Sequence, residues 1–276
     1  MKTLNDVSQF KVLVIGDAIY DRYRFCNALG RGTKESIISV KFEREETYKG
    51  GVWAAAEHIR DLVAKVDVWH GETATINTKY LAAYSQKVFS VHESKQEPDG
   101  FTPNIGEYDV VIVFDYGHGF LTLPMRQKIQ HESRWLAVNA QSNSSNYGFN
   151  RVNEKWPNAQ FCVVDELEAR LAAHEQDAPI EDVILKLPYD KIIVTMGSQG
   201  AVGYAYKEFY REPALTSRPI DLLGAGDAVL AVVAPFARVG WSIRDLVHLG
   251  NIAGSIKVGI LGHQTHITKE ELEKHL

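Results

Sequence analysis

The sequence lacks the features of several other classes of protein. It has only two cysteines, Cys26 and Cys162, and they stand in no metal-ligand spacing, so we expect reduced thiols in a cytoplasmic protein. No stretch approaches the roughly 20 apolar residues of a membrane span, and residues 1–10 lack the apolar core of a signal peptide. The net charge is −5 and no basic run stands out, which argues against nucleic acids and membranes as partners.

Short apolar runs alternate with helical patterns along the 276 residues. Buried strands are predicted at residues 11–15, 66–69, 109–114, 135–138, 161–164 and 192–195. Helices are predicted at residues 52–63, 122–132, 166–173, 228–237 and 243–258, with a last short one after the capping box of Thr268 and Glu271. This alternation predicts an α/β fold whose central sheet is mostly parallel and covered by helices on both faces.

Two regions do not fit this alternation. Residues 38–43 alternate between apolar and polar side chains, which is typical of a half-exposed antiparallel strand. Residues 80–84 and 88–91 bracket a short polar segment and indicate a hairpin. We expect these regions to form a small antiparallel sheet that projects from the main one.

Polar residues and glycine follow several of the predicted parallel strands. Asp17, Asp115, Asp165 and Gly197 each stand just after a strand end. In open parallel sheets, ligands bind at the carboxyl ends of the strands. We therefore expect these four residues to converge on one rim of the sheet.

Residues 224–227, Gly-Ala-Gly-Asp, stand directly before an apolar helical run. Glycines at a helix start let backbone N–H groups converge, and a helix N-terminus favours an anion such as a phosphate. Asp227 would fit there as a general base that takes a proton from a hydroxyl while the amides hold a phosphoryl group. An ordinary turn with Asp227 as a helix cap would also explain the motif, which alone decides nothing.

Five motifs in order resemble those of the PfkB/ribokinase-type carbohydrate kinases, over residues 11–262. They are Gly16-Asp17-Ala18-Ile19-Tyr20-Asp21, Gly50-Gly51, Thr195-Met196-Gly197-Ser198-Gln199-Gly200, Gly224-Ala225-Gly226-Asp227 and Asn251. Within the family, residues 16–23 and 115–119 look most like the kinase domain of bifunctional ADP-heptose synthases, which phosphorylates the anomeric hydroxyl of a heptose 7-phosphate. The resemblance implies a single ribokinase-like domain over residues 1–276, with lid strands near 24–48 and 78–93. It also implies a homodimer through that lid.

The resemblance implies ATP-dependent phosphorylation of a sugar or sugar phosphate, and a role for each motif. Asp227 would deprotonate the acceptor hydroxyl, and an anion hole would be formed by Gly224, Ala225 and Gly226. The sugar would be held by Asp17, Asp21, Gly50 and Gly51. ATP would be bound by Thr195, Gly197, Gly200 and Asn251. Mg²⁺ would sit mainly on phosphates and waters, ordered by Glu168 and Asp165.

The sequence departs from the family pattern at several positions. Ala54 stands where an asparagine normally follows the glycine pair, and Asp165 replaces the asparagine of the N-x-x-E motif. His118 replaces the lysine of a D-Y-x-K-G loop and so loses a fixed positive charge near pH 7. Only residues 70–76 connect the strand at 66–69 to the next lid strand, where relatives have a further helix and strand. We expect the sheet to be one βα unit shorter than usual.

These departures keep a second function open. The chain would then be a catalytically weak or inactive relative that binds sugar or nucleotide as a regulatory subunit, beside a separate nucleotidyltransferase. The charge of Asp165 would either tighten metal or repel nucleotide, and the sequence leaves this open, together with any need for a monovalent cation. The polar loop at 141–150 is more simply a solvated loop than a ligand contact. His263 and His266 lack the acidic or cysteine companions of a metal site.

Overall fold

The computed structural model describes residues 2–32, 37–82, 87–94, 103–216 and 219–276. Its larger sheet has the strand order β12-β11-β10-β9-β8-β7-β1-β4. These strands are β1 (Lys11–Gly16), β4 (Lys65–Trp69), β7 (Val110–Asp115), β8 (Leu136–Ala140), β9 (Phe161–Asp165), β10 (Lys191–Thr195), β11 (Ala201–Ala205) and β12 (Glu208–Glu212). The strand pairs from β10 to β4 in this order are parallel, whereas β11 pairs antiparallel with both β10 and β12. The predicted α/β fold with a mostly parallel sheet is confirmed.

The parallel strands are buried on both faces, as their continuous apolar sequences predict. Alternate side chains of one strand point to opposite faces, so Ile112 of β7 joins one hydrophobic core while Val111 and Val113 join the other. The α-helices of the described residues are α1 (Val52–Glu57), α2 (Leu123–Glu132), α3 (Val152–Lys155), α4 (Glu166–Ala173), α5 (Ile180–Leu185), α6 (Ala225–Arg238), α7 (Ile243–Val258) and α8 (Lys269–Glu273). Within the described ranges, short 3₁₀ helices are η1 (Leu4–Val7), η3 (Ile105–Glu107) and η4 (Gly197–Gln199).

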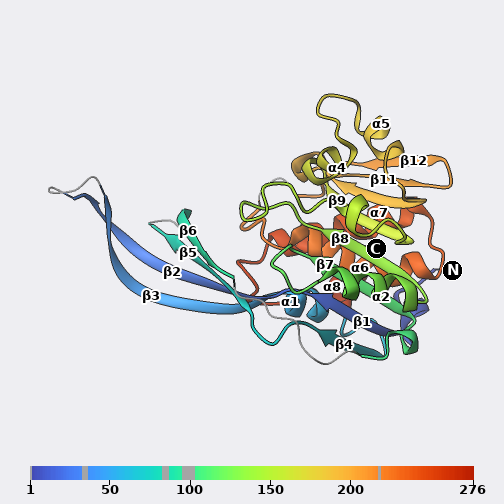
Figure 1. Cartoon of the computed structure of the whole chain (residues 1–276), viewed down its shortest axis with the longest axis horizontal. Helices are drawn as coiled ribbons and strands as arrows, with labels where there is room; N and C mark the ends of the chain where they lie inside the picture. Colours follow the sequence, from blue (N-terminus) through green and yellow to red (C-terminus); the bar gives the residue numbers. More distant parts are fainter. Residues whose placement is uncertain (1, 33–36, 83–86, 95–102, 217–218) are drawn as a thin grey trace.

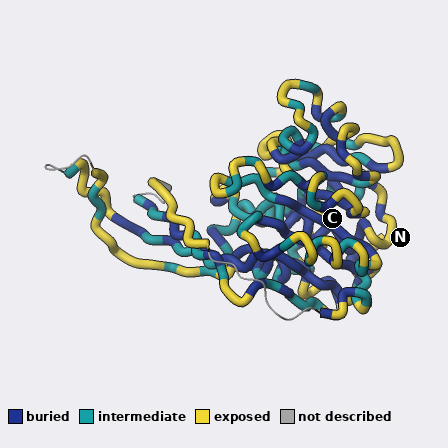
Figure 2. The backbone as a smooth tube through the Cα atoms, in the orientation of Figure 1, coloured by how far each residue is buried: buried dark blue, intermediate teal, exposed yellow. Residues whose placement is uncertain are grey.

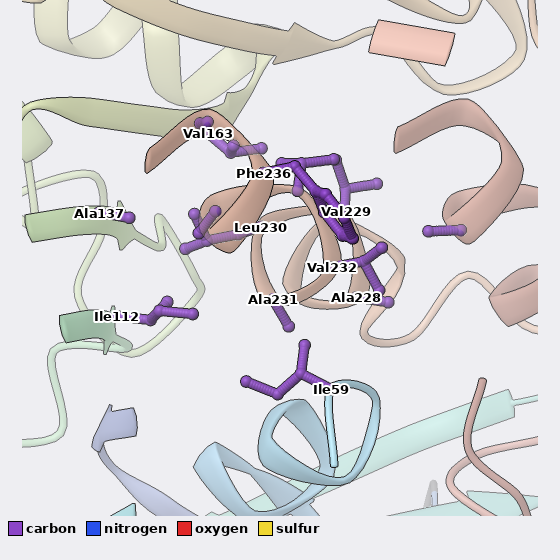
Figure 3. Packing of buried hydrophobic residues seen from close by; sticks show 14 of the residues in the cluster. Ile59, Ile112, Ala137, Val163, Ala228, Val229, Leu230, Ala231, Val232 and Phe236 are labelled. Carbon is purple, nitrogen blue, oxygen red and sulfur yellow. The ribbon is translucent and has the colours of Figure 1, made fainter. Parts of the chain in front are cut away.

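Helix α6 lies at the centre of the first core. Residues 228–237 are all buried, so the helix is enclosed on every side. Figure 3 shows its side chains surrounded by Ile112 of β7, Ala137 of β8, Val163 of β9 and Ile59, which follows α1. This packing fixes where the N-terminus of α6 emerges at the rim of the sheet.

The second sheet has the order β3-β2-β5-β6 and projects from the body of the molecule (Figure 1). Its strands are β2 (Ala18–Arg31), β3 (Ile38–Gly51), β5 (Thr75–Leu81) and β6 (Lys87–Glu93). We call this sheet the lid. Its outer pairs are antiparallel as predicted, whereas β2 and β5 run parallel. The lid is mostly buried where it joins the body and exposed toward its tip (Figure 2). Of the predicted hairpin turn at residues 85–87, residues 85 and 86 lie outside the described residues, and Lys87 begins β6.

The structure corrects three details of the sequence prediction. Helix α1 ends at Glu57 and not at residue 63, because the chain continues in i→i+3 turns such as Leu62 N–H to the Ile59 carbonyl. The β11–β12 hairpin was missed because its turn residues, Tyr206 and Lys207, have positive φ without being glycine or asparagine. The second lid strand was expected to end near residue 48, but β3 extends to Gly51.

The shortened edge of the sheet agrees with the expected loss of a βα unit. Strand β4 is the edge strand, and only residues 70–74 separate it from β5 in the lid. No helix lies in this short connection, which belongs to the described part of the chain. Among the described residues, the helices are too short or too polar to cross a bilayer.

Gly203 of β11 offers a test of how tightly α7 packs on the sheet. A Cβ atom there would lie 2.5 Å from Val247 Cγ2 and 2.6 Å from Ile243 Cγ1. We expect Gly203→Ala to lower the free energy of unfolding by about 1–3 kcal/mol through overpacking, measured by urea denaturation. Gly106→Ala is the control, because a Cβ atom there would lie 3.8 Å from its nearest neighbour, the Glu132 carbonyl oxygen. Equal stability of both variants would show that α7 is free to move.

Candidate active site

The Gly-Ala-Gly-Asp motif forms the start of α6. Gly224 precedes the helix with φ 71°, a left-handed conformation that glycine adopts without strain. The helix begins at Ala225 and not at residue 228 as predicted, so Gly226 and Asp227 belong to its first turn. The first N–H groups of a helix have no acceptor within it. A Cβ atom at Gly226 would meet no other atom within 4 Å, so there is open space beside these donors.

A cavity of about 540 Å³ opens at this turn. Its volume lies in the usual range of ligand sites, about 300–1,000 Å³. It is lined by all the residues that the sequence analysis assigned to catalysis, ATP or metal, namely Asp165, Glu168, Thr195, Gly197, Gly200, Gly224, Ala225, Gly226, Asp227 and Asn251. The fold therefore brings together motifs from β9, β10, α6 and α7.

The predicted ATP turn follows β10. The Met196 N–H donates to the Gly200 carbonyl at 2.7 Å and closes the turn. Only glycine fits at Gly200, where φ is 90° and a Cβ atom would lie 2.0 Å from the Glu212 carbonyl oxygen. The Asn251 amide donates to the carbonyls of Glu212 and Pro213 at 3.4 and 3.3 Å. Asn251 thus holds the segment that forms one wall of the cavity.

Asp165 and Glu168 form a capping box at the start of α4. Asp165 Oδ1 accepts from the Glu168 N–H at 2.8 Å, and Glu168 Oε2 accepts from the Asp165 N–H at 2.9 Å. Glu168 Oε1 accepts from the Ser142 N–H at 3.0 Å. Burial and the nearby Asp165 charge raise the pKa of Glu168 above its usual range. The aspartate that replaces the family asparagine therefore serves as the helix cap.

These two carboxyl groups fit an indirect role toward a metal ion. The described residues contain no group of three His, Cys, Asp or Glu side chains able to hold one. Both oxygens of Glu168 already accept backbone N–H groups. Mg²⁺ commonly keeps several waters and binds through substrate phosphates, so Asp165 and Glu168 fit the surroundings of its water shell.

Asp227 lies half-buried at the cavity. Burial raises its pKa above the ordinary aspartate value, and the Tyr116 hydroxyl and the positive charges of His263 and Lys257 oppose this rise. The Tyr116 side chain is itself buried. A carboxylate with a raised pKa is a stronger base near neutral pH.

The predicted sugar-binding residues form a second group, at the base of the lid. Pairing of β2 with β3 places Gly50 opposite Ile19 and Gly51 opposite Ala18. A Cβ atom at Gly50 would lie 2.1 Å from Asp21 Oδ2, so glycine is required there. The group does not line the cavity described above. Tyr116 nevertheless links the two groups, because its N–H donates to Asp17 Oδ2 and its hydroxyl interacts with Asp227.

Asp21 is held by two side chains that the sequence did not assign to the sugar site. Lys79 Nζ of β5 lies 2.6 Å from Asp21 Oδ1, and His263 Nε2 lies 3.4 Å from Asp21 Oδ2. Burial raises the pKa of Asp21, but the His263 hydrogen bond and the Lys79 charge outweigh it, and the net pKa is lowered. A lysine within an alternating strand was the only sequence signal for Lys79. His263 was considered with His266 for a metal site and lies instead beside this carboxylate.

Asp17 is buried and neutral over much of the pH range. Its Oδ2 accepts from the N–H groups of Tyr116 and His118 at 3.1 and 3.4 Å. Oδ1 is buried without a hydrogen-bond partner among the described residues. Burial and the charge of Asp115 raise the pKa of Asp17 to about 7. Burial lowers the pKa of His118 to about 4, so this histidine does not replace the positive charge of the family lysine.

After the glycine pair, where the sequence also departs from the family pattern, Trp53 and Ala54 pack against the rest of the protein. Ala54 is buried, and the ring of Trp53 packs between Tyr20 and His70 at centroid distances of 5.1 and 5.0 Å.

The polar loop at 141–150 is more than a solvated loop. Asn143 donates to the Tyr116 carbonyl at 2.8 Å, and Asn150 donates to the Asp115 carbonyl at 2.7 Å. Asp115 is buried, and its Oδ2 accepts in turn from Trp156 Nε1 at 2.9 Å. The loop therefore supports the segment after β7.

Comparison with known proteins identifies the family. The model of the pfkB family carbohydrate kinases matches residues 90–270, more than half of the chain. The chain belongs to the pfkB family of carbohydrate kinases. The pfkB fold of this chain is also found in the ribokinase of Thermotoga maritima, with a TM-score of 0.76 at 14% identity over 96% of this chain and 99% of that one.

Two relatives show which pfkB-family proteins this chain resembles in sequence. It is 25% identical over 311 aligned residues to the bifunctional protein HldE of Nitratiruptor sp., which covers 96% of this chain and 64% of HldE. It therefore spans less than two thirds of the length of that relative. It is 24% identical over 307 residues to the D-beta-D-heptose 7-phosphate kinase of Bordetella bronchiseptica, covering 96% of each.

The raised pKa of Asp17 predicts a pH-dependent stability. The carboxyl is protonated in the folded state up to about pH 7 but ionises near 3.8 when unfolded, so its contribution to stability is lost as pH rises between these values. We expect Asp17→Asn, which keeps the shape, to be stabilised relative to the native chain by up to about 1.4 kcal/mol per pH unit over this range. Urea denaturation at several pH values measures the difference. If the difference in the free energy of unfolding between Asp17→Asn and the native chain stayed constant with pH, the raised pKa of Asp17 would be contradicted.

Proposed function

We propose that this pfkB-family chain transfers the γ-phosphoryl group of ATP to a hydroxyl of a sugar phosphate of the heptose type. The observation that carries the proposal is the position of Asp227. It stands at the N-terminus of α6, in the same cavity as the Thr195–Gly200 turn and Asn251. The heptose 7-phosphate kinase of Bordetella bronchiseptica, similar over nearly its whole length, supports the choice of sugar.

In the proposed reaction, Asp227 takes the proton of the acceptor hydroxyl. The oxygen then attacks the γ-phosphorus of ATP, and the bond from that phosphorus to the β,γ-bridging oxygen breaks as ADP leaves. The N–H groups of Ala225 and Gly226 and the positive end of α6 stabilise the charge on the transferring group. Asp17 and Asp21 orient the sugar, with Gly50 and Gly51 allowing the close approach of the backbone.

The nucleotide would lie along the cavity wall. Thr195, Gly197 and Gly200 surround its phosphates, and Asn251 holds the wall beside its base. Mg²⁺, when bound, would neutralise phosphate charge. Asp165 and Glu168 would hold its water shell in place from the start of α4.

Asp227→Asn tests the general base. We expect kcat to fall by about 10²–10⁴-fold, while ATP affinity measured by calorimetry stays close to that of the native chain. In the native chain, kcat should fall as pH drops through the Asp227 pKa, which is raised above 3.8. The assay follows ADP release with Mg-ATP across hexoses, heptoses and their phosphates.

Asp177→Asn, an exposed aspartate on the surface, is the matched control and should keep full activity. If the native chain released no ADP with any sugar of the panel and did not bind ATP, the proposal would be overturned. The chain would then be the inactive, ligand-binding homologue that the departures from the family pattern also allow.

We further propose that the chain works in the cytoplasm beside a separate nucleotidyltransferase. Its two cysteines are free and buried, which suits a reducing compartment. The relative from Nitratiruptor is named bifunctional and is covered over only 64% of its length.

The lid is the proposed interface of a homodimer. Large apolar side chains are exposed on its strands, among them Ile38 at 67%, Phe42 at 55% and Phe89 at 45%. We expect Phe42→Glu to shift the chain from dimer to monomer in sedimentation equilibrium, because it places a charge in the apolar surface. Lys41→Glu, exposed on the opposite face of β3, should leave the dimer intact. A native chain that is monomeric at assay concentrations would refute this interface.

A further inference from the structure

Lys257, in the last turn of α7, is a lysine without solvent exposure. Its Nζ donates to the carbonyl oxygen of Gly262 at 2.8 Å. An ammonium group buried without compensating charge is very unfavourable, so its surroundings must supply negative potential. Burial lowers the pKa of Lys257, and the charges of Asp221, Asp227 and Asp21 oppose that fall.

Asp221 joins two segments that meet at the start of α6. Its Oδ2 accepts from the Gly262 N–H at 3.0 Å and from the Tyr23 hydroxyl at 3.3 Å, and its Oδ1 accepts from the Leu223 N–H at 3.2 Å. The Asp221 N–H donates to the Val258 carbonyl at 3.1 Å. Residues 220–224 are thus bonded to residues 257–262 on both sides.

The ammonium group lies next to the proposed anion hole. A Cβ atom at Gly224 would be only 3.6 Å from Lys257 Cε. Gly224 is the residue from which α6 begins, and the amides of Ala225 and Gly226 follow it directly. A positive charge here holds the two segments together and adds to the positive potential of the helix terminus.

We propose that Lys257 is a built-in monovalent cation, a positioning residue that fixes the anion hole and makes a dissolved cation unnecessary for the reaction. This inference rests on the proposed kinase function. A potassium or ammonium ion carries the same charge as the lysine head group. Either ion could therefore supply that charge between the same two segments if the side chain were removed. This role of Lys257 could not be predicted from the sequence, because a lysine within an apolar helical pattern does not indicate which residues surround it in the fold.

The test compares monovalent cations at constant ionic strength, with choline as the inert reference. The native chain should have the same kcat in choline, sodium, potassium and ammonium chloride. In Lys257→Ala, kcat in choline should fall about 10- to 100-fold, and potassium or ammonium should restore it with a saturable dependence. Lys257→Met, which fills the space without charge, should lose kcat and not be restored. Lys257→Arg should keep part of the activity.

Lys191→Ala is the matched control, because Lys191 also donates to a main-chain carbonyl, that of Ala237 at 3.4 Å, but at the other end of α6. It should show no cation dependence. Activation of the native chain several-fold by potassium would overturn the proposal, and so would a Lys257→Ala variant that no cation restores.

A second measurement does not depend on turnover. The Tm of Lys257→Ala should rise in potassium or ammonium chloride relative to choline chloride, whereas the Tm of the native chain and of Lys191→Ala should not. If the kinase assay is silent but this difference is found, the proposed function fails and the cation site stands. If Tm does not respond and the variant is folded, the cation site fails independently of the kinase.

Discussion

The arrangement of the site depends on the complete burial of α6. A helix with one apolar face can rotate or slide on its support, but α6 contacts the sheet on one side and α1 and α7 on the others. Displacing it would open cavities in a core that is packed as densely as a crystal. The amides at its N-terminus are therefore preorganised, which is what electrostatic stabilisation of a transferring group requires. The other motifs are arranged around this fixed point.

Sequence patterns predicted the parallel part of the main sheet well, because it follows from local rules. Continuous apolar runs mark buried parallel strands, and parallel strands bring their carboxyl ends to one rim. Asp165 and Gly197 could therefore be expected at one rim, whereas Thr195, Gly200 and Asn251 were assigned only through the resemblance to the family. The length of β2 and β3 was less predictable, because a projecting ribbon is stabilised by cross-strand pairs that leave little periodic signal.

The side chains that surround the carboxylates of the site were not predicted, for a different reason. Lys79, Lys257 and His263 come from a lid strand, a helix interior and a loop, and each is ordinary in its local sequence. Their importance arises only where the fold places them beside Asp21, Asp221 and Asp227. A motif records the residues nearest a ligand, whereas the charges that balance those residues come from anywhere in the chain. Buried carboxylates at a predicted site should thus prompt a search for lysines in apolar patterns.

A tethered cation and a dissolved one solve the same electrostatic problem at different costs. A dissolved ion loses translational freedom on binding, and its occupancy depends on its concentration. The ammonium of Lys257 avoids both, but it must be buried permanently, which disfavours its charged form. The carboxylates of Asp221 and Asp227 offset that cost, and Asp227 is needed for the proposed chemistry in any case. The lysine therefore uses negative charge already present at the site, and its own charge partly opposes the rise in the Asp227 pKa that burial causes.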